Sequence, residues 1–275
     1  MVALLCAGCA GVAPDRGLPP ATPPDVAGSQ IEVAVVSVLD GDSIVAADGS
    51  DDIEMRLAGI NAPERDECLG PDARRRLTEL AGTTLLVTPR GLDQFGRTLV
   101  QAWSLDGEWI NLTMVATGSA LTLSGSADSV SAAELDALIE AQDSAVEAGI
   151  GLWDPGACGA RGPRPAVELD LTSPNPAGPD DDVLDQEYVT IINEEPEPLD
   201  LSGWTLRDES TANRLVFPPG SVIEAGRSVR VVTGCTGGPN IFAWCAERSI
   251  WSNGGDSGYL LDDAGRIVAT DRYRP

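Results

Sequence analysis

Polar residues that can bind a hard cation follow short apolar runs in the first quarter of the sequence. Asp40-Gly41-Asp42 comes directly after the Val-rich segment 31–39, and Asn61-Ala62-Pro63-Glu64 ends a later apolar segment. Two carboxylates that flank a Gly in a tight turn can converge on a hard cation, and Asn and Glu side chains offer further oxygen ligands. An Asp-Gly-Asp turn alone is common, so the interpretation depends on the residues around it.

Two arginines add positive charge to the same part of the chain. Arg56 lies inside the apolar run Met55-Arg56-Leu57, and Arg97 follows a Gly at the start of a predicted strand. A buried Arg needs an anionic partner or ligand. The chain contains no His, which excludes Ser-His-Asp triads, Cys-His pairs and zinc sites with His ligands. Catalysis here must therefore use carboxylates, Arg, hydroxyls, thiols or a hard metal ion.

The elements that must position these residues form a strand-rich first half. Short β-like runs alternate with helical segments, and the last helix is opened by Ser131 with Glu134 three residues later, a capping box. The predicted strands are 31–39, 43–47, 53–60, 84–87 and 98–103, and the predicted helices are 71–80, 109–117 and 131–148. Three strands, a helix, two strands and two helices are typical of an OB-fold β-barrel with three helices.

Beyond residue 165 the sequence contains no persistent helical period. The segment 159–165, Gly-Ala-Arg-Gly-Pro-Arg-Pro, has the composition of a linker. Seven short β-like runs follow, separated by turn residues: 166–171, 188–192, 204–207, 215–217, 228–232, 259–261 and 267–270. This pattern predicts an immunoglobulin-like β-sandwich. The fold class is therefore mainly β, in two domains.

The first 30 residues predict export rather than folded structure. Residues 1–9 are apolar and end in Cys6-Ala7-Gly8-Cys9, which is similar to a bacterial lipoprotein signal with Cys9 as the lipidated residue. A plain signal fragment without lipid is the alternative. Residues 10–30 are rich in Pro and predict an extended tether. No later segment is long enough to span a membrane. From the signal-like start we expect an exported protein, extracellular or attached to the cell envelope.

Charge and cysteine content set two further limits. The net charge is −25 and all 18 basic residues are Arg, so long-range repulsion of polyanions argues against loose binding of nucleic acid while leaving a local Arg cluster possible. Four cysteines follow the export segment: Cys68, Cys158, Cys235 and Cys245. An even set in an exported chain indicates disulfides, and four cysteines allow three pairings.

Three motifs of the first half carry a family resemblance. They are Val-Leu-Asp-Gly-Asp-Ser (38–43), Arg-Leu-Ala-Gly-Ile-Asn-Ala-Pro-Glu (56–64) and Asp-Gln-Phe-Gly-Arg (93–97), and Gly-Leu-Trp (151–153) follows. In this order and at this spacing, residues 31–155 resemble the staphylococcal nuclease-like (thermonuclease) family. The resemblance implies a Ca²⁺-dependent enzyme that cuts DNA, RNA or both.

The resemblance also implies a role for each matching residue. Asp42 would ligate Ca²⁺, with Asp40 nearby through water, and Asn61 and Ala62 would add a side-chain oxygen and a backbone carbonyl. Glu64 would be the general base or would position the attacking water. Arg56 and Arg97 would bind the scissile phosphate. Two guanidinium groups and a dication supply the positioning and charge neutralisation that phosphoryl transfer needs.

Three departures from the family pattern concern residues that would bind the metal or the substrate. Asn61 stands where the family often has Asp, which removes one charge from the metal site. Gln94 and Phe95, as substrate-binding candidates, replace a Lys-Tyr pair, and 121–128 lacks the Tyr residues that stack on a base. We therefore expect a catalytic centre with weakened or altered binding of the substrate.

The second half resembles a lamin-tail domain. The matching residues include Leu201-Ser202-Gly203-Trp204 and Trp251-Ser252-Asn253-Gly254-Gly255-Asp256, in which Asn253 and Asp256 are expected to be turn residues. The resemblance implies an accessory module whose ligand the sequence does not identify. Given the two resemblances, the domains are 31–158 and 166–275, and this division favours the pairs Cys68–Cys158 and Cys235–Cys245.

The sequence thus predicts a monomeric, exported, Ca²⁺-dependent endonuclease. The alternative is a nuclease-like scaffold with little or no activity that binds a partner at the cell envelope. The acidity, Asn61 and the missing Tyr residues favour the scaffold, whereas two Arg residues kept beside carboxylates favour the enzyme.

Overall fold

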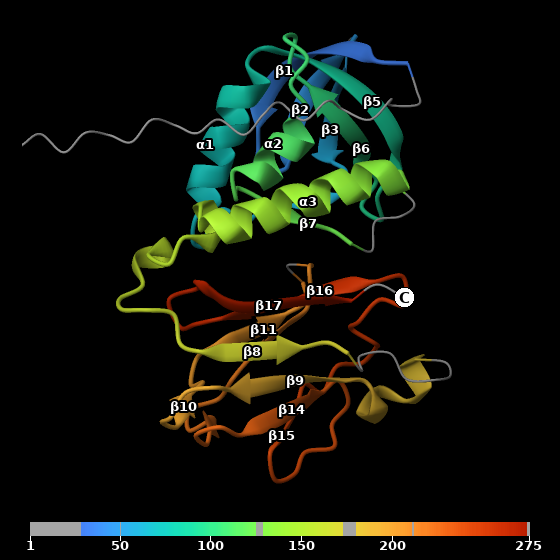
Figure 1. Cartoon of the computed structure of the whole chain (residues 1–275). Helices are drawn as coiled ribbons and strands as arrows, with labels where there is room; N and C mark the ends of the chain where they lie inside the picture. The colour runs from blue at the N-terminus through green and yellow to red at the C-terminus, as the bar shows by residue number, and fades with distance from the viewer. Residues whose placement is uncertain (1–28, 50, 125–128, 173–179, 211, 274–275) are drawn as a thin grey trace, which may run out of the picture.

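A computed structural model describes residues 29–49, 51–124, 129–172, 180–210 and 212–273. The predictions for 1–9, Cys9 and nearly all of the tether 10–30 fall outside this range, as does half of the segment 121–128. The described residues form two units stacked end to end, a barrel with helices and a β-sandwich (Figure 1). This agrees with the two-domain, mainly β fold class expected from the sequence.

The first unit is a closed five-stranded barrel in the order β1-β2-β3-β6-β5. All neighbouring strands are antiparallel except β3 and β6, which run parallel. The strands are β1 (Ile31–Val38), β2 (Ser43–Asp48), β3 (Asp51–Leu57), β5 (Thr84–Leu92) and β6 (Thr98–Trp103). Their inward-facing apolar residues share one core with the helices, including Ile44, Leu57 and Leu85.

Three helices cover the barrel: α1 (Gly70–Ala81), α2 (Ile110–Ala116) and α3 (Ala132–Ala148). Helix α1 has Pro71 in its first turn and buries Ala73, Leu77 and Ala81, which are four residues apart and therefore share one face. The predicted capping box of α3 is present, since Ser131 accepts a hydrogen bond from the Glu134 amide and the Glu134 side chain accepts one from the Ser131 amide.

The strand predicted at 53–60 is in fact two strands. β3 ends at Leu57, and the chain turns at Gly59, whose φ of 77° is easily adopted only by glycine. The short strand β4 (Ile60–Asn61) then leaves the barrel and pairs with β7 (Leu121–Thr122), with Asn61 opposite Leu121. This turn carries the end of the motif 56–64 away from the barrel wall.

The second unit is a sandwich of two four-stranded sheets, as predicted for an immunoglobulin-like domain. One sheet has the order β12-β11-β16-β17 and the other β15-β14-β9-β8. Trp204, Phe217 and Trp251 are buried between them. The strands are β8 (Val167–Asp170), β9 (Tyr188–Asn193), β10 (Leu199–Asp200), β11 (Thr205–Arg207), β12 (Arg214–Val216), β13 (Val222–Ile223), β14 (Ser228–Val232), β15 (Ile241–Ala243), β16 (Asp256–Leu261) and β17 (Ile267–Tyr273).

Four short 3-10 helices complete the structure: η1 (Gly151–Trp153), η2 (Ala157–Gly159), η3 (Asp180–Asp182) and η4 (Leu184–Gln186). Both disulfides join the pairs that the domain division favoured, Cys68–Cys158 and Cys235–Cys245. Among the described residues, no helix combines the length and apolar character needed to cross a membrane.

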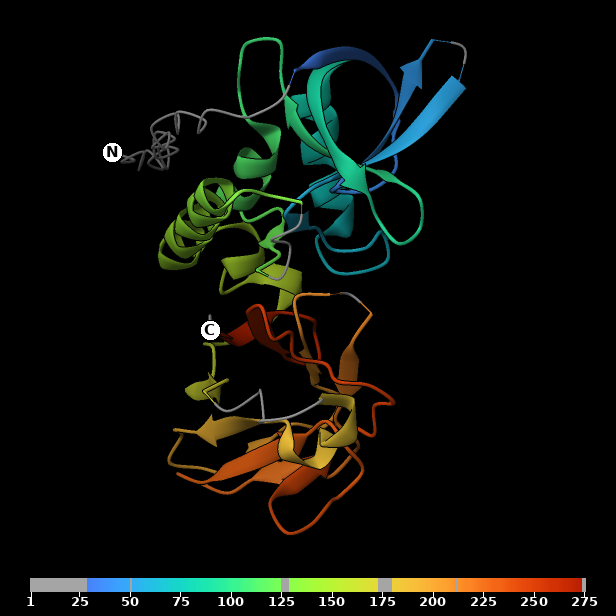
Figure 2. The ribbon, with the colours of Figure 1, turned by 90° about the vertical axis from the view of Figure 1, so that its right-hand side faces the viewer.

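The two units share a buried apolar contact. Helix α3 and the segment after it lie against the sheet that contains β16 and β17 (Figures 1 and 2). This contact has its own apolar cluster, formed by Leu121, Ala145, Leu152, Trp153, Tyr259 and Ile267. At its edges, the Arg266 guanidinium donates to the Pro155 carbonyl at 2.8 Å, and Arg272 pairs with Asp143 at 3.1 Å. Burial of several large apolar side chains makes this a firm interface rather than a loose tether.

Candidate catalytic site

The turn between β1 and β2 places Asp42 at the end of the barrel. The Asp40 side chain accepts a hydrogen bond from the Asp42 amide at 3.0 Å and closes the turn. A Cβ atom on Gly41 would lie 2.5 and 2.7 Å from the Cβ atoms of Ala62 and Ala73. The glycine therefore lets the turn pack directly against the segment after β4 and against α1, which brings Asp42 next to Ala62.

Asp42 is a buried carboxylate, with only 2% of its surface exposed. Its Oδ2 accepts a hydrogen bond from the Ala62 amide at 2.7 Å, and its Oδ1 accepts one from the Ser43 hydroxyl at 3.0 Å and pairs with the Arg56 guanidinium. Burial raises the pKa of Asp42 to about 6, although the charge of Arg56 and these hydrogen bonds oppose the shift. The carboxylate thus lies where additional positive charge would be stabilising.

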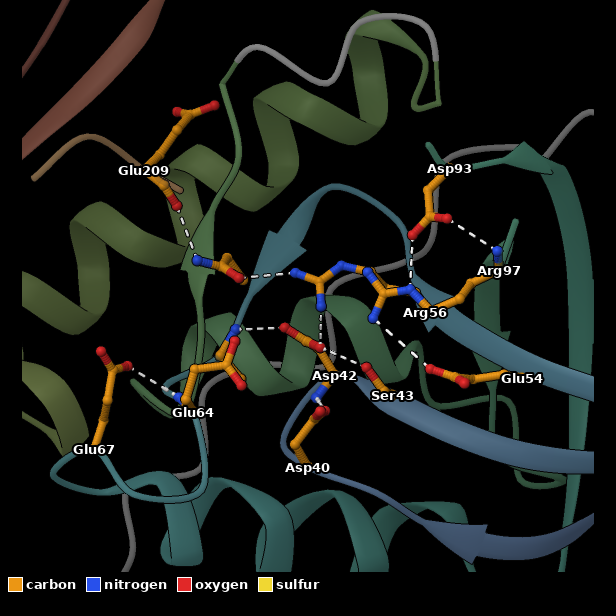
Figure 3. Close-up of polar contacts among 12 residues, drawn as sticks. Asp40, Asp42, Ser43, Glu54, Arg56, Glu64, Glu67, Asp93, Arg97 and Glu209 are labelled. Carbon is orange, nitrogen blue, oxygen red and sulfur yellow. Dashed lines mark hydrogen bonds and ion pairs between the residues drawn. The ribbon is translucent and has the colours of Figure 1, made fainter. Parts of the chain in front are cut away.

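Arg56 joins Asp42 to Asn61. In the β2–β3 register Arg56 lies opposite Ser43, which places its side chain beside Asp42. Its second terminal nitrogen, Nη2, donates to Asn61 Oδ1 at 2.7 Å (Figure 3). The expectation that a buried Arg here has an anionic partner is confirmed, and the partner is Asp42. One guanidinium therefore holds together two of the oxygens assigned to the metal.

Glu64 lies on the loop between β4 and α1 and is exposed. Its amide donates to Glu67 Oε2 at 2.9 Å, and its carbonyl accepts from the Glu67 amide at 3.0 Å. A Cβ atom on Gly70 would lie 1.8 Å from the Glu64 carbonyl oxygen, so only glycine allows α1 to begin so close to this loop. Figure 3 shows the Glu64 side chain on the same side of the loop as Asp42, and its exposure leaves it reachable from solvent.

Arg97 lies at the end of the turn between β5 and β6, one residue before β6. The Asp93 carboxylate accepts from the Arg97 amide at 2.9 Å and from Arg97 Nε at 2.7 Å, and Glu54 Oε1 lies 3.9 Å from Arg97 Nη1. Burial alone would raise the pKa of Asp93, but the bonds from Arg97 and from the Phe95 amide lower it. Figure 3 shows the Arg97 side chain joined to both Asp93 and Glu54.

The two substrate-binding candidates lie on that same turn. Gln94 and Phe95 are exposed, and 73% of the surface of Phe95 is open to solvent. The Arg97 guanidinium lies 5.4 Å from the centre of the Phe95 ring. A cation–π contact at this distance steadies the side chain of Arg97. Phe95 is therefore placed to orient the Arg97 side chain.

The Asp42 carboxylate and the Asn61 amide oxygen, both in contact with Arg56, are oxygens of the type that Ca²⁺ prefers. Across the part of the chain that the structure describes, no cluster of three or more acidic, Cys or His side chains could hold a metal ion. A metal at this site would therefore depend on the Asp42 carboxylate, on neutral oxygens from Asn61 and Ala62, and on water. This donor set is weakly charged.

The sequence did not predict that the second unit reaches this site. The loop between β11 and β12 brings Glu209 to Asn61, whose Nδ2 donates to the Glu209 carbonyl at 2.9 Å. Arg214 of the same unit pairs with Glu67 at 2.5 Å. Local patterns give no sign of contacts between residues 148 positions apart. Asn253 lies in a turn, as expected, whereas Asp256 is the first residue of β16, and its buried carboxylate accepts from the amides of Ser252 and Ser257.

Comparison with known proteins assigns both halves of the chain. Residues 54–155 match the model of the family described as staphylococcal nuclease homologue, and residues 163–274 match the Lamin Tail Domain. The matched interval of the first family begins after Asp40 and Asp42, which lie in the turn between β1 and β2 of the same barrel.

Three relatives match part of the chain. An uncharacterized endonuclease of Escherichia coli O157:H7 is 38% identical over 93 residues, 34% of this chain and 61% of the relative. An uncharacterized endonuclease of Haemophilus influenzae is 32% identical over 122 residues, 43% of this chain and 64% of the relative. A micrococcal nuclease of Shigella flexneri is 42% identical over 66 residues, 24% of this chain and 38% of the relative. The chain thus spans less than two thirds of the length of each.

Proposed function

From the premise that this chain joins a staphylococcal nuclease homologue domain to a lamin tail domain, we propose that it is an endonuclease that hydrolyses phosphodiester bonds of DNA, RNA or both. The observation that carries the proposal is the meeting of Asp42, Arg56, Asn61, Glu64 and Arg97 at one end of the barrel. They come from three separate segments of the chain, 38–43, 56–64 and 93–97, and a barrel that served only as a scaffold would not require this convergence.

The two arginines are the proposed phosphate ligands. Both guanidinium groups are partly buried, with side-chain exposures of 16% for Arg56 and 22% for Arg97. Each is held by a carboxylate, Asp42 or Asp93, so little rotational freedom is lost when a phosphate binds. Paired guanidinium groups match the oxygens of a phosphodiester and neutralise the charge that builds up in the transition state.

Glu64 is the proposed general base. Its side chain is exposed, as a group that takes a proton from an attacking water must be, and its loop is braced by Glu67 and Gly70. A positioned carboxylate accelerates attack by removing the proton as the bond to phosphorus forms. No His is needed for this step, which suits a chain that contains none.

Ca²⁺ is the proposed cofactor, held by Asp42, Asn61 and the Ala62 carbonyl, with Asp40 acting through water. When bound, the ion neutralises phosphate charge and lowers the pKa of a bound water. Support comes from the buried Asp42 carboxylate and from the hard oxygen donors around it. Because Arg56 contacts both Asp42 and Asn61, the ion would share these oxygens with the guanidinium, and we expect modest affinity.

We also propose that the protein is exported, as a monomer, and acts outside the cell or at the cell envelope. The two disulfides support this location, because such bonds persist in oxidising compartments. The Cys6-Ala7-Gly8-Cys9 segment supports export and a lipid anchor on Cys9. The net charge of −25 would limit binding of nucleic acid away from the catalytic site.

The decisive experiment measures cleavage of single-stranded DNA, double-stranded DNA and RNA by the purified protein with Ca²⁺, with Mg²⁺ and with a chelator. The variants Glu64→Gln and Arg97→Ala are expected to lower kcat at least a hundredfold. The matched controls are Glu79→Gln and Arg75→Ala, which change exposed residues on the outer face of α1. They are expected to leave the rate unchanged.

Cleavage in the presence of chelator would overturn the assignment of the cofactor, and equal loss in the controls would overturn the residue roles. A folded protein that cleaves nothing at millimolar Ca²⁺ would favour the second candidate, a nuclease-like binding scaffold. One observation favours that candidate: the Arg56 guanidinium already contacts Asp42 and Asn61, the two side chains whose oxygens a metal would need.

A further inference from the structure

The loop between β11 and β12 of the lamin tail domain is fixed to the nuclease barrel by Glu209. Only 7% of the surface of Glu209 is exposed. Its carbonyl accepts from Asn61 Nδ2 at 2.9 Å, and its carboxylate accepts from the Ser124 amide at 2.6 Å (Figure 3 shows the bond to Asn61). Its own amide donates to the Asp256 carboxylate. All three polar groups of this residue are therefore used.

The contacts of Glu209 with the nuclease domain converge on one structural unit beside the barrel, the strand pair β4–β7. Asn61 lies on β4, and Ser124 follows β7, the strand that pairs with β4. Ser124 makes a second contact across the domain boundary, since its hydroxyl lies 3.0 Å from that of Ser257. The two-residue pair β4–β7 is too short to be stable by itself. The lamin tail domain thus supports the strand pair that presents Asn61 to the site.

The bond to Glu209 also decides which end of the Asn61 amide faces the site. An amide has one acceptor end and one donor end. Because Nδ2 donates to the Glu209 carbonyl, Oδ1 must point toward Arg56, which it meets at 2.7 Å. A carboxylate at position 61 would instead place an oxygen against the Glu209 carbonyl oxygen. Asn61, which stands where the family often has Asp, therefore suits the Glu209 carbonyl of the second domain better than a carboxylate would.

We propose that Glu209 of the lamin tail domain is a positioning residue for the nuclease site, acting through Asn61. The effect on catalysis rests on the proposed nuclease function, whereas the effect on the Asn61 side chain does not. In this arrangement the second domain is part of the catalytic framework rather than a separate appendage. Its removal would free β4 and β7 and allow the Asn61 amide to rotate.

The test uses the full chain with Glu209→Ala and Glu209→Gln. Ala keeps the backbone carbonyl that binds Asn61 but loses the carboxylate bond to the Ser124 amide, which holds that carbonyl in place. Gln retains an oxygen that can accept from the Ser124 amide, so it should rescue what Ala loses. The matched control is Glu224→Ala, an exposed Glu elsewhere in the same domain. Side-chain amide signals of Asn61 are followed by nuclear magnetic resonance, assigned through their absence in Asn61→Ala. We expect slow solvent exchange in wild type, Glu209→Gln and the control, and at least tenfold faster exchange in Glu209→Ala.

Kinetics provide the second measurement. A misplaced Asn61 should lower kcat about tenfold in Glu209→Ala, with KM changed less than twofold, and Glu209→Gln should restore kcat. Equal amide exchange in wild type and Glu209→Ala would overturn the proposal, as would a wild-type kcat in Glu209→Ala. If no variant cleaves nucleic acid, the nuclease function fails and the exchange measurement alone decides the positioning role.

Discussion

Asp208 gives a sharp prediction about stability and pH. It directly follows β11 at the domain boundary and exposes only 4% of its surface. Its carboxylate accepts from the Ser210 amide at 2.8 Å and from the Asn213 side chain at 2.6 Å. Burial, with a further contribution from the nearby Asp256 charge, raises the pKa of Asp208 from 3.8 to about 7, even though these hydrogen bonds and Arg207 oppose the shift.

The magnitude follows from the difference between the folded and unfolded pKa values. A rise from 3.8 to about 7 is about 3 pH units, and at 1.36 kcal/mol per unit it corresponds to about 4 kcal/mol. Because the folded pKa lies above the unfolded value, the folded state holds the proton more tightly. The stabilisation is complete below pH 3.8 and is lost as the pH rises through 7. Asp208 therefore destabilises the protein at pH 8.

The variant Asp208→Asn removes this charge and keeps the size of the side chain. Urea unfolding of wild type and variant at half-unit steps from pH 4.5 to 8 measures the free energy of unfolding. Between pH 4.5 and 7, we expect the free energy of unfolding of the variant to rise relative to that of the wild type by up to about 1.4 kcal/mol per pH unit. The control Asp263→Asn changes an exposed residue and should show no such slope. Parallel curves for wild type and Asp208→Asn would refute the reasoning.

Three further predictions concern the covalent and steric framework. Replacing both Cys68 and Cys158 by Ser should lower the free energy of unfolding by about 4 kcal/mol, because the bond closes a loop of 90 residues; a loss under 1 kcal/mol in urea unfolding would contradict it. Gly41→Ala should cost about 1–3 kcal/mol, since its Cβ would lie 2.5 Å from another side chain; an unchanged Tm is the contrary result. Asn61→Asp should lower Tm at pH 8, because one of its carboxylate oxygens would face the Glu209 carbonyl; an unchanged Tm would count against it.

Local sequence patterns were sufficient to predict the main elements of the fold. The segments 98–103 and 228–232 are strands over the predicted residues, and Ser131 with Glu134 marks the start of α3. These signals depend on neighbours a few positions away, so they need no knowledge of the tertiary structure. The two-residue strands β10 and β13 were missed, because two residues cannot display a period of two.

The candidate site was predictable in its members but not in its connections. The family resemblance implied that Asp42, Arg56 and Asn61 would meet, and hydrogen bonds from Arg56 join it to both of the others. The catalytic and metal-binding roles remain predictions. Glu209 could not be foreseen, because its importance comes from the docking of one domain on another. The burial of Asp256 is likewise a result of tertiary packing. The local sequence Gly-Gly-Asp does not indicate it.

The Cys68–Cys158 disulfide changes what a protease can do to this molecule. Cys158 lies just before the segment that leads into the lamin tail domain, and Cys68 lies on the loop after Glu64. A single cut of the backbone anywhere between the two cysteines would leave both fragments covalently attached. The amino-terminal fragment would keep β1 to β4, and the carboxyl-terminal fragment would keep the second domain. In a medium that contains proteases, a nicked molecule could thus retain its assembled site until the bond is reduced.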